Sequence, residues 1–218
     1  MSDRGPEGGS RFIVVAGTGT EIGKTYVAAR VAAALRERGV IVAARKPVQS
    51  FAPEDDEPTD ADALAAATGE DTVAVCPEHR RLPRAMAPPM AAEALGLSPF
   101  TVAELAAEVG RTVPDDSIVL VESAGGVRSP LAADGDTVSL VAALQPALVL
   151  LVADAGLGTI NLVRLSADAL APHRVIVVLN RFDDRDELHV RNREWLVTRH
   201  GLEVVTDPEA VAKLLVGA

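Results

Sequence analysis

Two lysines stand where phosphate chemistry could use them. The chain has only three lysines among its 21 basic residues. Lys24 lies in residues 17–25, GTGTEIGKT, and Lys46 opens residues 46–48, KPV. Because an ammonium is a compact point charge and a guanidinium is a bulky planar fork, lysine is the better residue to place among phosphate oxygens. We therefore interpret both as phosphate-binding residues. Lys213, near the C-terminus, is expected on the surface.

The segments around Lys24 predict the elements that position a phosphate-binding loop. Residues 12–16 are a short apolar run, typical of a buried parallel strand. After Lys24, apolar residues recur at helical spacing until Gly39. A helix N-terminus offers free backbone N–H groups and a favourable dipole to an anion. The loop is unusual because Thr18 stands where the standard phosphate-binding loop has its first glycine. The nucleotide-binding residues predicted here are Gly19, Thr20, Glu21, Ile22, Gly23, Lys24 and Thr25.

Apolar strands alternate with helical patterns along the rest of the chain. Further strands are expected at 40–44, 117–121, 147–152, 175–179 and 202–205. Helices are expected at 60–67, 89–95, 102–111, 138–144, 161–170, 186–199 and 208–215. This alternation indicates a doubly wound α/β fold, with a mostly parallel sheet covered by helices on both faces, as in P-loop NTPases. We expect a disordered lead-in over residues 1–11 and one domain over residues 12–218.

Composition narrows the class of protein. The 218 residues are 48% apolar, and the net charge of −10 argues against a nucleic-acid surface, which is usually basic. There is no apolar run long enough for a transmembrane helix, so we expect no membrane partner. Cys76 is the only cysteine, which excludes an internal disulfide. We expect Cys76 to be structural and the protein to be cytoplasmic.

Polar residues follow several of the predicted strands, where parallel sheets bind their ligands. Glu122 ends the 117–121 strand and could hold Mg²⁺, unless it is an ordinary strand-end acid. Asp62 opens a helical stretch and could reach the same metal, the alternative being a solvated loop charge. Asn180 offers a donor and an acceptor that complement a purine edge, although it could simply cap a turn. With the Thr25 hydroxyl, the sequence predicts an Mg²⁺ site formed by Thr25, Asp62 and Glu122.

Taken together, these segments resemble the dethiobiotin synthetase family. The resemblance runs in order from about residue 12 to residue 182. The matching segments are GTGTEIGKT at 17–25, KPVQS at 46–50, DAL at 62–64, MAPPMAA at 86–92, VESAGG at 121–126, LGTIN at 157–161, and Asn180. The loop that contains Glu21 and the Lys-Pro-Val segment are quite specific when they occur together.

The resemblance implies an ATP-dependent ring closure. In this family, 7,8-diaminopelargonate takes up CO₂ (or bicarbonate) as a carbamate, which attacks the γ-phosphate, and the second amine then closes a ureido ring. It implies Mg²⁺ as cofactor, ATP as substrate and a homodimer in which a helix N-terminus near 158–161 binds the substrate carboxylate across the interface. The catalytic residues implied are Lys46, Lys24, Thr20 and Ser50. The substrate-binding residues implied are Ser50, Gly125, Gly158 and Asn161.

Three residues depart from the family pattern. Phe51 and Ser123 stand where glycines are usual, and Leu162 stands where a histidine often follows the asparagine. A nucleotide-binding paralogue without synthetase activity therefore stays open, as does an ATPase switch of the ParA/MinD kind, although such switches carry an early loop lysine that this chain lacks. The chain is too short for the amidotransferase domain of a cobyrinate a,c-diamide synthetase. The choice among ATP, CTP and GTP is also open.

Overall fold

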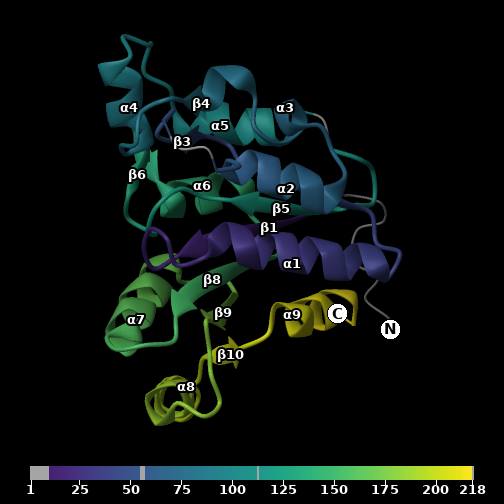
Figure 1. Ribbon diagram of the computed structural model, residues 1–218, viewed down its shortest axis with the longest axis vertical. Helices are drawn as coiled ribbons and strands as arrows, with labels where there is room; N and C mark the ends of the chain where they lie inside the picture. Colours follow the sequence, from purple (N-terminus) through teal and green to yellow (C-terminus); the bar gives the residue numbers. More distant parts are fainter. Residues whose placement is uncertain (1–9, 55–56, 112, 218) are drawn as a thin grey trace.

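A single parallel sheet forms the centre of the molecule (Figure 1). The computed structural model describes residues 10–54, 57–111 and 113–217. The strand order is β10-β9-β8-β1-β5-β2, and every neighbouring pair is parallel. The bounds of these strands are β1 Arg11–Gly17, β2 Val42–Arg45, β5 Ile118–Glu122, β8 Leu148–Asp154, β9 Val175–Asn180 and β10 Glu203–Val205.

Two small ribbons lie outside this sheet. Their strands are β3 Gln49–Ser50 with β4 Arg81–Leu82, and β6 Pro130–Ala132 with β7 Gly135–Asp136. Strands of two or three residues are too short to show a hydrophobic period, so the sequence did not predict them.

Helices cover both faces of the sheet because the side chains of each strand alternate between the faces. On β1, Ile13 and Val15 pack into a core with α1, α2 and α9, whereas Val14 and Ala16 pack into a core with α4 to α8. The helices are α1 Lys24–Glu37, α2 Asp60–Thr68, α3 Thr72–Val75, α4 Pro88–Ala94, α5 Val102–Val109, α6 Thr137–Leu144, α7 Thr159–Leu170, α8 Glu187–His200 and α9 Pro208–Val216, with a 3₁₀ turn at Glu78–Arg80. Among the described residues, no helix has the length and hydrophobicity needed to cross a membrane.

The doubly wound α/β fold is confirmed, and each predicted strand and longer helix lies within two residues of its observed bounds. The short helix α3 was not predicted. The predicted lead-in over residues 1–11 overlaps β1 at Arg11, whose N–H donates to the Ser117 carbonyl over 2.8 Å. Residues 1–9 lie outside the described part of the chain.

The topology brings the carboxyl ends of the strands to one edge of the sheet. Since β1 lies between β5 and β8, the end of β1 at Gly17 is flanked by Glu122 on one side and Asp154 on the other. Asn180 ends the next strand along, β9. The loop after β1, Glu122 and Asn180 therefore lie at this edge, where open parallel sheets bind their ligands.

Candidate nucleotide and metal site

The loop between β1 and α1 has the form of a phosphate cradle. Gly23 precedes α1 with a left-handed φ of 88°, and Glu21 also has a positive φ of 58°. The buried Lys24 side chain folds back over the loop, and its Nζ donates to the Gly19 carbonyl over 2.8 Å. Burial, with the like charge of Lys46 as a second cause, lowers the pKa of Lys24. The ammonium and the N–H groups of α1 thus border the same loop, where an anion would lie.

Two residues at the end of β9 and just after it contact this loop from the side. The Asn180 amide donates to the Ile22 carbonyl over 2.9 Å, and the Arg181 guanidinium donates to the Glu21 carbonyl over 2.8 Å. Arg181 also forms an ion pair of 3.0 Å with Asp154. Asn180, predicted to contact the base, therefore braces the phosphate loop in this structure, and Arg181 is a loop contact that the sequence did not predict.

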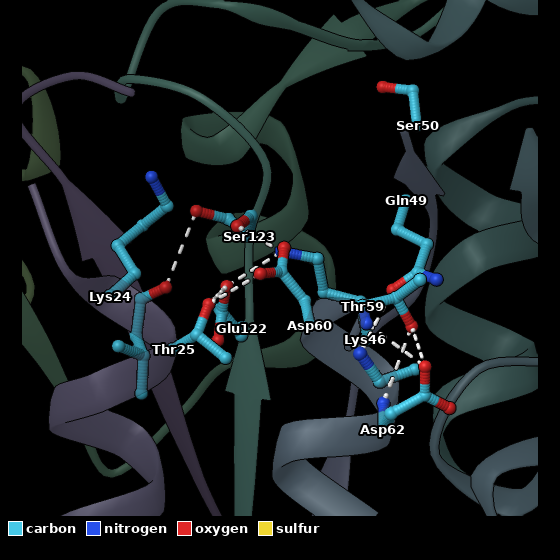
Figure 2. Close-up of polar contacts among 12 residues, drawn as sticks. Lys24, Thr25, Lys46, Gln49, Ser50, Thr59, Asp60, Asp62, Glu122 and Ser123 are labelled. Atoms are coloured by element: carbon cyan, nitrogen blue, oxygen red, sulfur yellow. Dashed lines mark hydrogen bonds and ion pairs between the residues drawn. The ribbon is translucent and has the colours of Figure 1, made fainter. Parts of the chain in front are cut away.

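Thr25 lies between two carboxylates (Figure 2). Its hydroxyl oxygen is 2.7 Å from Asp60 Oδ1 and 2.9 Å from Glu122 Oε1. Lys46 joins the same two acids, with its Nζ 2.6 Å from Glu122 Oε1 and 2.7 Å from Asp60 Oδ2. These residues come from α1, α2, the end of β2 and the end of β5, and they form a compact cluster that we call the Lys46 cluster: Thr25, Lys46, Asp60 and Glu122.

The Lys46 cluster is electrostatically coupled. Lys46 is 2% exposed and Glu122 is 1% exposed, so both charges are out of water. Burial alone would lower the pKa of Lys46, but the negative charges of Glu122 and Asp60 outweigh it and raise that pKa above its ordinary value. Burial would likewise raise the pKa of Asp60, yet Lys46 outweighs it and lowers that pKa. The lysine is therefore charged and Asp60 is its ionised counter-ion, whereas burial raises the pKa of Glu122, which Lys46 and Thr25 contact directly.

Asp62 does not join this cluster, so the structure does not bring it together with the other two predicted metal ligands, Thr25 and Glu122. Its carboxylate accepts hydrogen bonds from the Thr59 N–H at 3.0 Å and the Thr59 hydroxyl at 2.7 Å, and it lies 3.7 Å from Arg81. Thr59 and Asp62 form a capping box at the start of α2, a pattern of Thr and an acid three residues later that was visible in the sequence. Asp60, and not Asp62, lies beside Thr25 and Lys46, and Figure 2 shows the two carboxylates apart.

A buried glutamine helps to place Asp60. Gln49, 3% exposed in β3, accepts a hydrogen bond from the Ala61 N–H over 3.0 Å. This bond ties the first turn of α2 to the segment that follows Lys46. No sequence pattern marks Gln49, because its role depends on a contact between two separate elements.

The donors of the Lys46 cluster fit a hard divalent cation. Mg²⁺ prefers oxygen ligands and is usually held by one or two carboxylates together with substrate phosphates. Thr25, Asp60 and Glu122 offer a hydroxyl and two carboxylates, and buried Glu122 Oε2 has no hydrogen-bond partner among the described residues. Among the described residues, no three acidic, histidine or cysteine side chains lie close enough together to hold a metal without other ligands. The site therefore fits a metal that arrives with phosphates.

A cavity of about 870 Å³ opens over the loop and the Lys46 cluster. Its walls include ten residues of the predicted or observed site: Thr20, Glu21, Gly23, Lys24, Thr25, Lys46, Ser50, Asp60, Glu122 and Gly125. The Ser50 hydroxyl, in this wall, donates to the Met86 carbonyl over 2.6 Å. Gly158 and Asn161 are not in the wall and lie at the start of α7, where Asn161 is exposed. The volume is in the usual range for a small-molecule site.

The departures from the family pattern have different consequences. Ser123 is fully buried, its hydroxyl lies 3.4 Å from the Val15 carbonyl, and it does not line the cavity. Phe51 does line the cavity, and Leu162 is exposed on α7.

Burial raises the pKa of Cys76 to about 12, so this thiol stays protonated and is no nucleophile at neutral pH.

Comparison with known proteins agrees with the geometry. A family model described as an AAA domain matches residues 11–213. The ATP-dependent dethiobiotin synthetase BioD of Streptomyces coelicolor is 42% identical over 72% of this chain, and the match spans 65% of that relative's length. The protein of the same name from Mycobacteroides abscessus is 34% identical over 94% of this chain and 89% of the relative.

A solved structure of the signal recognition particle receptor FtsY from Elizabethkingia anophelis superposes with a TM-score of 0.51 at 13% identity, covering 93% of this chain and 64% of that one. This likeness shows the fold alone. The sequence matches go further, because they are 42% identical over 72% of this chain and 34% identical over 94% of it. The chain belongs to the dethiobiotin synthetase family.

Proposed function

We propose that this protein is a dethiobiotin synthetase, which closes the ureido ring of dethiobiotin from 7,8-diaminopelargonate, CO₂ and ATP. The observation that carries the proposal is the position of Lys46, whose ammonium lies in the same cavity as Lys24 and Ser50 and directly beside Glu122. A carbamate that attacks a phosphate is one anion approaching another, so the reaction needs cations between them.

The phosphate loop would hold the triphosphate. Backbone N–H groups between Gly19 and Thr25 would bind its β- and γ-phosphates, and Lys24 would exchange its hydrogen bond to the Gly19 carbonyl for phosphate oxygens. Thr25, Asp60 and Glu122 are the residues that would hold Mg²⁺, which supplies charge neutralisation for the phosphates. The proposed metal ligands thus include Asp60 in place of Asp62.

Lys46, Thr20 and Ser50 would act at the reacting atoms. The amine of the diamine adds CO₂ to form a carbamate and releases a proton. A carbamate oxygen then attacks the γ-phosphorus, and ADP leaves with the electrons of the broken P–O bond. Lys46 would neutralise the charge between carbamate and phosphate, while Thr20 and Ser50 donate hydrogen bonds to their oxygens. The second amine attacks the carbamoyl carbon and expels phosphate, which closes the ring.

The substrate carboxylate would bind at the N-terminus of α7, near Gly158 and Asn161, in a homodimer. This helix has 12 residues, so its free N–H groups form a sound anion site. Leu157, Leu162 and Leu165 are 91%, 47% and 62% exposed in one chain, and such exposed leucines on one short segment favour coverage by a second copy. Sedimentation should show a dimer that Leu165→Glu weakens, whereas Val216→Glu, on α9, should leave it intact.

The test of function is substrate-dependent phosphate release. Release from ATP should require both 7,8-diaminopelargonate and bicarbonate, and mass spectrometry should detect dethiobiotin. Substituting CTP or GTP for ATP in the same assay decides the nucleotide preference. Phosphate release that does not depend on the diamine would contradict the proposed synthetase activity and favour a nucleotide-dependent switch. We also propose a cytoplasmic location, with which the composition and the single cysteine agree.

A further inference from the structure

Lys46 forms ion pairs with the same two carboxylates that the proposed function assigns to the metal. Its Nζ lies 2.6 Å from Glu122 Oε1 and 2.7 Å from Asp60 Oδ2. It also approaches the Ser123 carbonyl at 3.3 Å, so its three protons have three acceptors. This is a complete cation site, already filled by an ammonium.

Lys24 offers a comparison within the same cavity. It carries the same charge on the same stem, but its Nζ donates to the Gly19 carbonyl and not to an acid. Its charge acts on Glu122 and Asp60 only through space. The two lysines therefore differ in whether they occupy the carboxylate pair, although both lie near it.

We infer that Lys46 acts as an internal counter-ion that occupies the carboxylate pair in the nucleotide-free protein and is displaced from it when the metal–nucleotide complex binds. A divalent cation that enters alone must compete with an ammonium at both acids, and it gains no phosphate ligand in return. A cation that arrives with a triphosphate brings new acceptors for the ammonium, because the γ-phosphate can take over the bonds that Lys46 loses.

Burial explains why Glu122 needs a counter-ion at all times. A buried carboxylate that loses its partner carries a large desolvation cost, and Glu122 is 1% exposed. Exchange of one cation for another keeps Glu122 neutralised throughout the binding cycle. The same exchange would bring Lys46 to the γ-phosphate only when a complete metal–nucleotide complex is present, which makes this residue a determinant of binding order.

The inference rests on the proposed function only for the location of the metal and the phosphates, and its test needs no turnover. The probe is Mn²⁺ alone, titrated into nucleotide-free protein and followed by the electron paramagnetic resonance of free Mn²⁺. Wild type should bind weakly, and Lys46→Met should bind at least about tenfold more tightly because the competing ammonium is gone. Lys24→Met, the matched control, should change Mn²⁺ affinity much less.

Equal effects of the two variants, or no gain in Lys46→Met, would overturn the inference. Lys46→Met could be unstable, so its unfolding temperature is measured with and without Mn²⁺. Because a ligand of the folded state stabilises it, Mn²⁺ should raise this temperature more in Lys46→Met than in wild type. A variant that stays unfolded at high Mn²⁺ shows that the metal cannot replace the ammonium, which also overturns the inference. Failure of diamine-dependent phosphate release in wild type would instead count against the proposed function alone.

Discussion

Asp60 and Asp62 lie on the first turn of α2, two positions apart, and their carboxylates have separate partners. Asp60 is 2.7 Å from both the Thr25 hydroxyl and the Lys46 ammonium, whereas Asp62 accepts both hydrogen bonds of Thr59. One acid thus faces the candidate metal site and the other caps the helix. Their similar sequence contexts make them a matched pair for testing the site.

Asp60→Asn should weaken metal binding, and Asp62→Asn should destabilise the start of α2. We expect Asp60→Asn to raise the Mg²⁺ concentration needed for half-maximal turnover and to lower kcat, because a carboxylate ligand is lost. Asp62→Asn should cost about 1 kcal/mol of unfolding free energy, as loss of a cap does, and leave the Mg²⁺ requirement unchanged. Steady-state kinetics at a series of Mg²⁺ concentrations measures the metal requirement of each variant, and urea unfolding measures its unfolding free energy. An equal shift in Mg²⁺ requirement would return Asp62 to the ligand set.

Gly23→Ala should disturb the phosphate loop through Asn180. Both Gly23 and Gly39 have left-handed φ, 88° and 76°, so alanine at either costs about 1–2 kcal/mol. A Cβ at Gly23 would collide with the Asn180 amide, but one at Gly39 meets nothing within 4 Å. We expect only Gly23→Ala to weaken nucleotide binding, because Asn180 must then leave the Ile22 carbonyl. Calorimetric titration with ATP should separate the variants, and equal affinities would refute this coupling.

Arg181→Ala should also weaken nucleotide binding, since it removes the hydrogen bond to the Glu21 carbonyl and the ion pair with Asp154. Glu21 and Arg181 both have positive φ without being glycine, a costly conformation that this bond helps to hold. Arg191→Ala is the control, because Arg191 pairs only with exposed Glu187 on its own helix among the contacts described. We expect Arg181→Ala to raise the KM for ATP and Arg191→Ala to leave it unchanged. Arg181→Lys should restore part of the affinity that Arg181→Ala loses. A lower kcat at unchanged KM would argue against the bracing role.

Glu108 links the stability of the α5 region to pH. Its carboxylate receives two bonds from the Arg80 guanidinium, at 2.8 and 2.9 Å, and Arg80 lies 4.6 Å above the Phe100 ring. The bond from Arg80 is the main cause that lowers the pKa of Glu108 below its ordinary value. Since the folded pKa is the lower one, this contribution is present above the unfolded pKa of about 4.3 and is lost as pH falls through the folded pKa.

Glu108→Gln should therefore be destabilised at neutral pH by about 2 kcal/mol, the usual size for a charge-assisted hydrogen bond. The difference from wild type should shrink as the pH falls below about 4, where the wild-type carboxyl also becomes neutral. Urea unfolding at several pH values measures this difference. Glu104→Gln, in the exposed capping box of α5, is a control that removes a carboxylate hydrogen-bonded to Thr101 and not to Arg80. A difference that stays constant with pH would exclude a role for the Glu108 charge.

Local signals determined most of the fold. The apolar runs at residues 13–16 and 175–179 identify buried strands because only a sheet covered on both faces tolerates uninterrupted apolar residues. The loop from Gly17 to Thr25 could likewise be predicted from the sequence, because its glycines, lysine and threonine act through neighbouring backbone positions. The family assignment followed from the same segments, and the comparisons support it.

The composition of the Lys46 cluster was decided by the tertiary structure. Lys46 and Glu122 are 76 positions apart, and Thr25 and Asp60 are 35 apart, so no spacing rule connects them. Their meeting depends on the order of β1, β5 and β2 in the sheet and on the angle at which α2 begins. That angle depends on the capping box and on Gln49, which together place Asp60 beside Thr25 and Lys46 and keep Asp62 on Thr59. The sequence by itself determined which residue types the site needs, whereas the packing of separate elements decided which aspartate supplies the carboxylate.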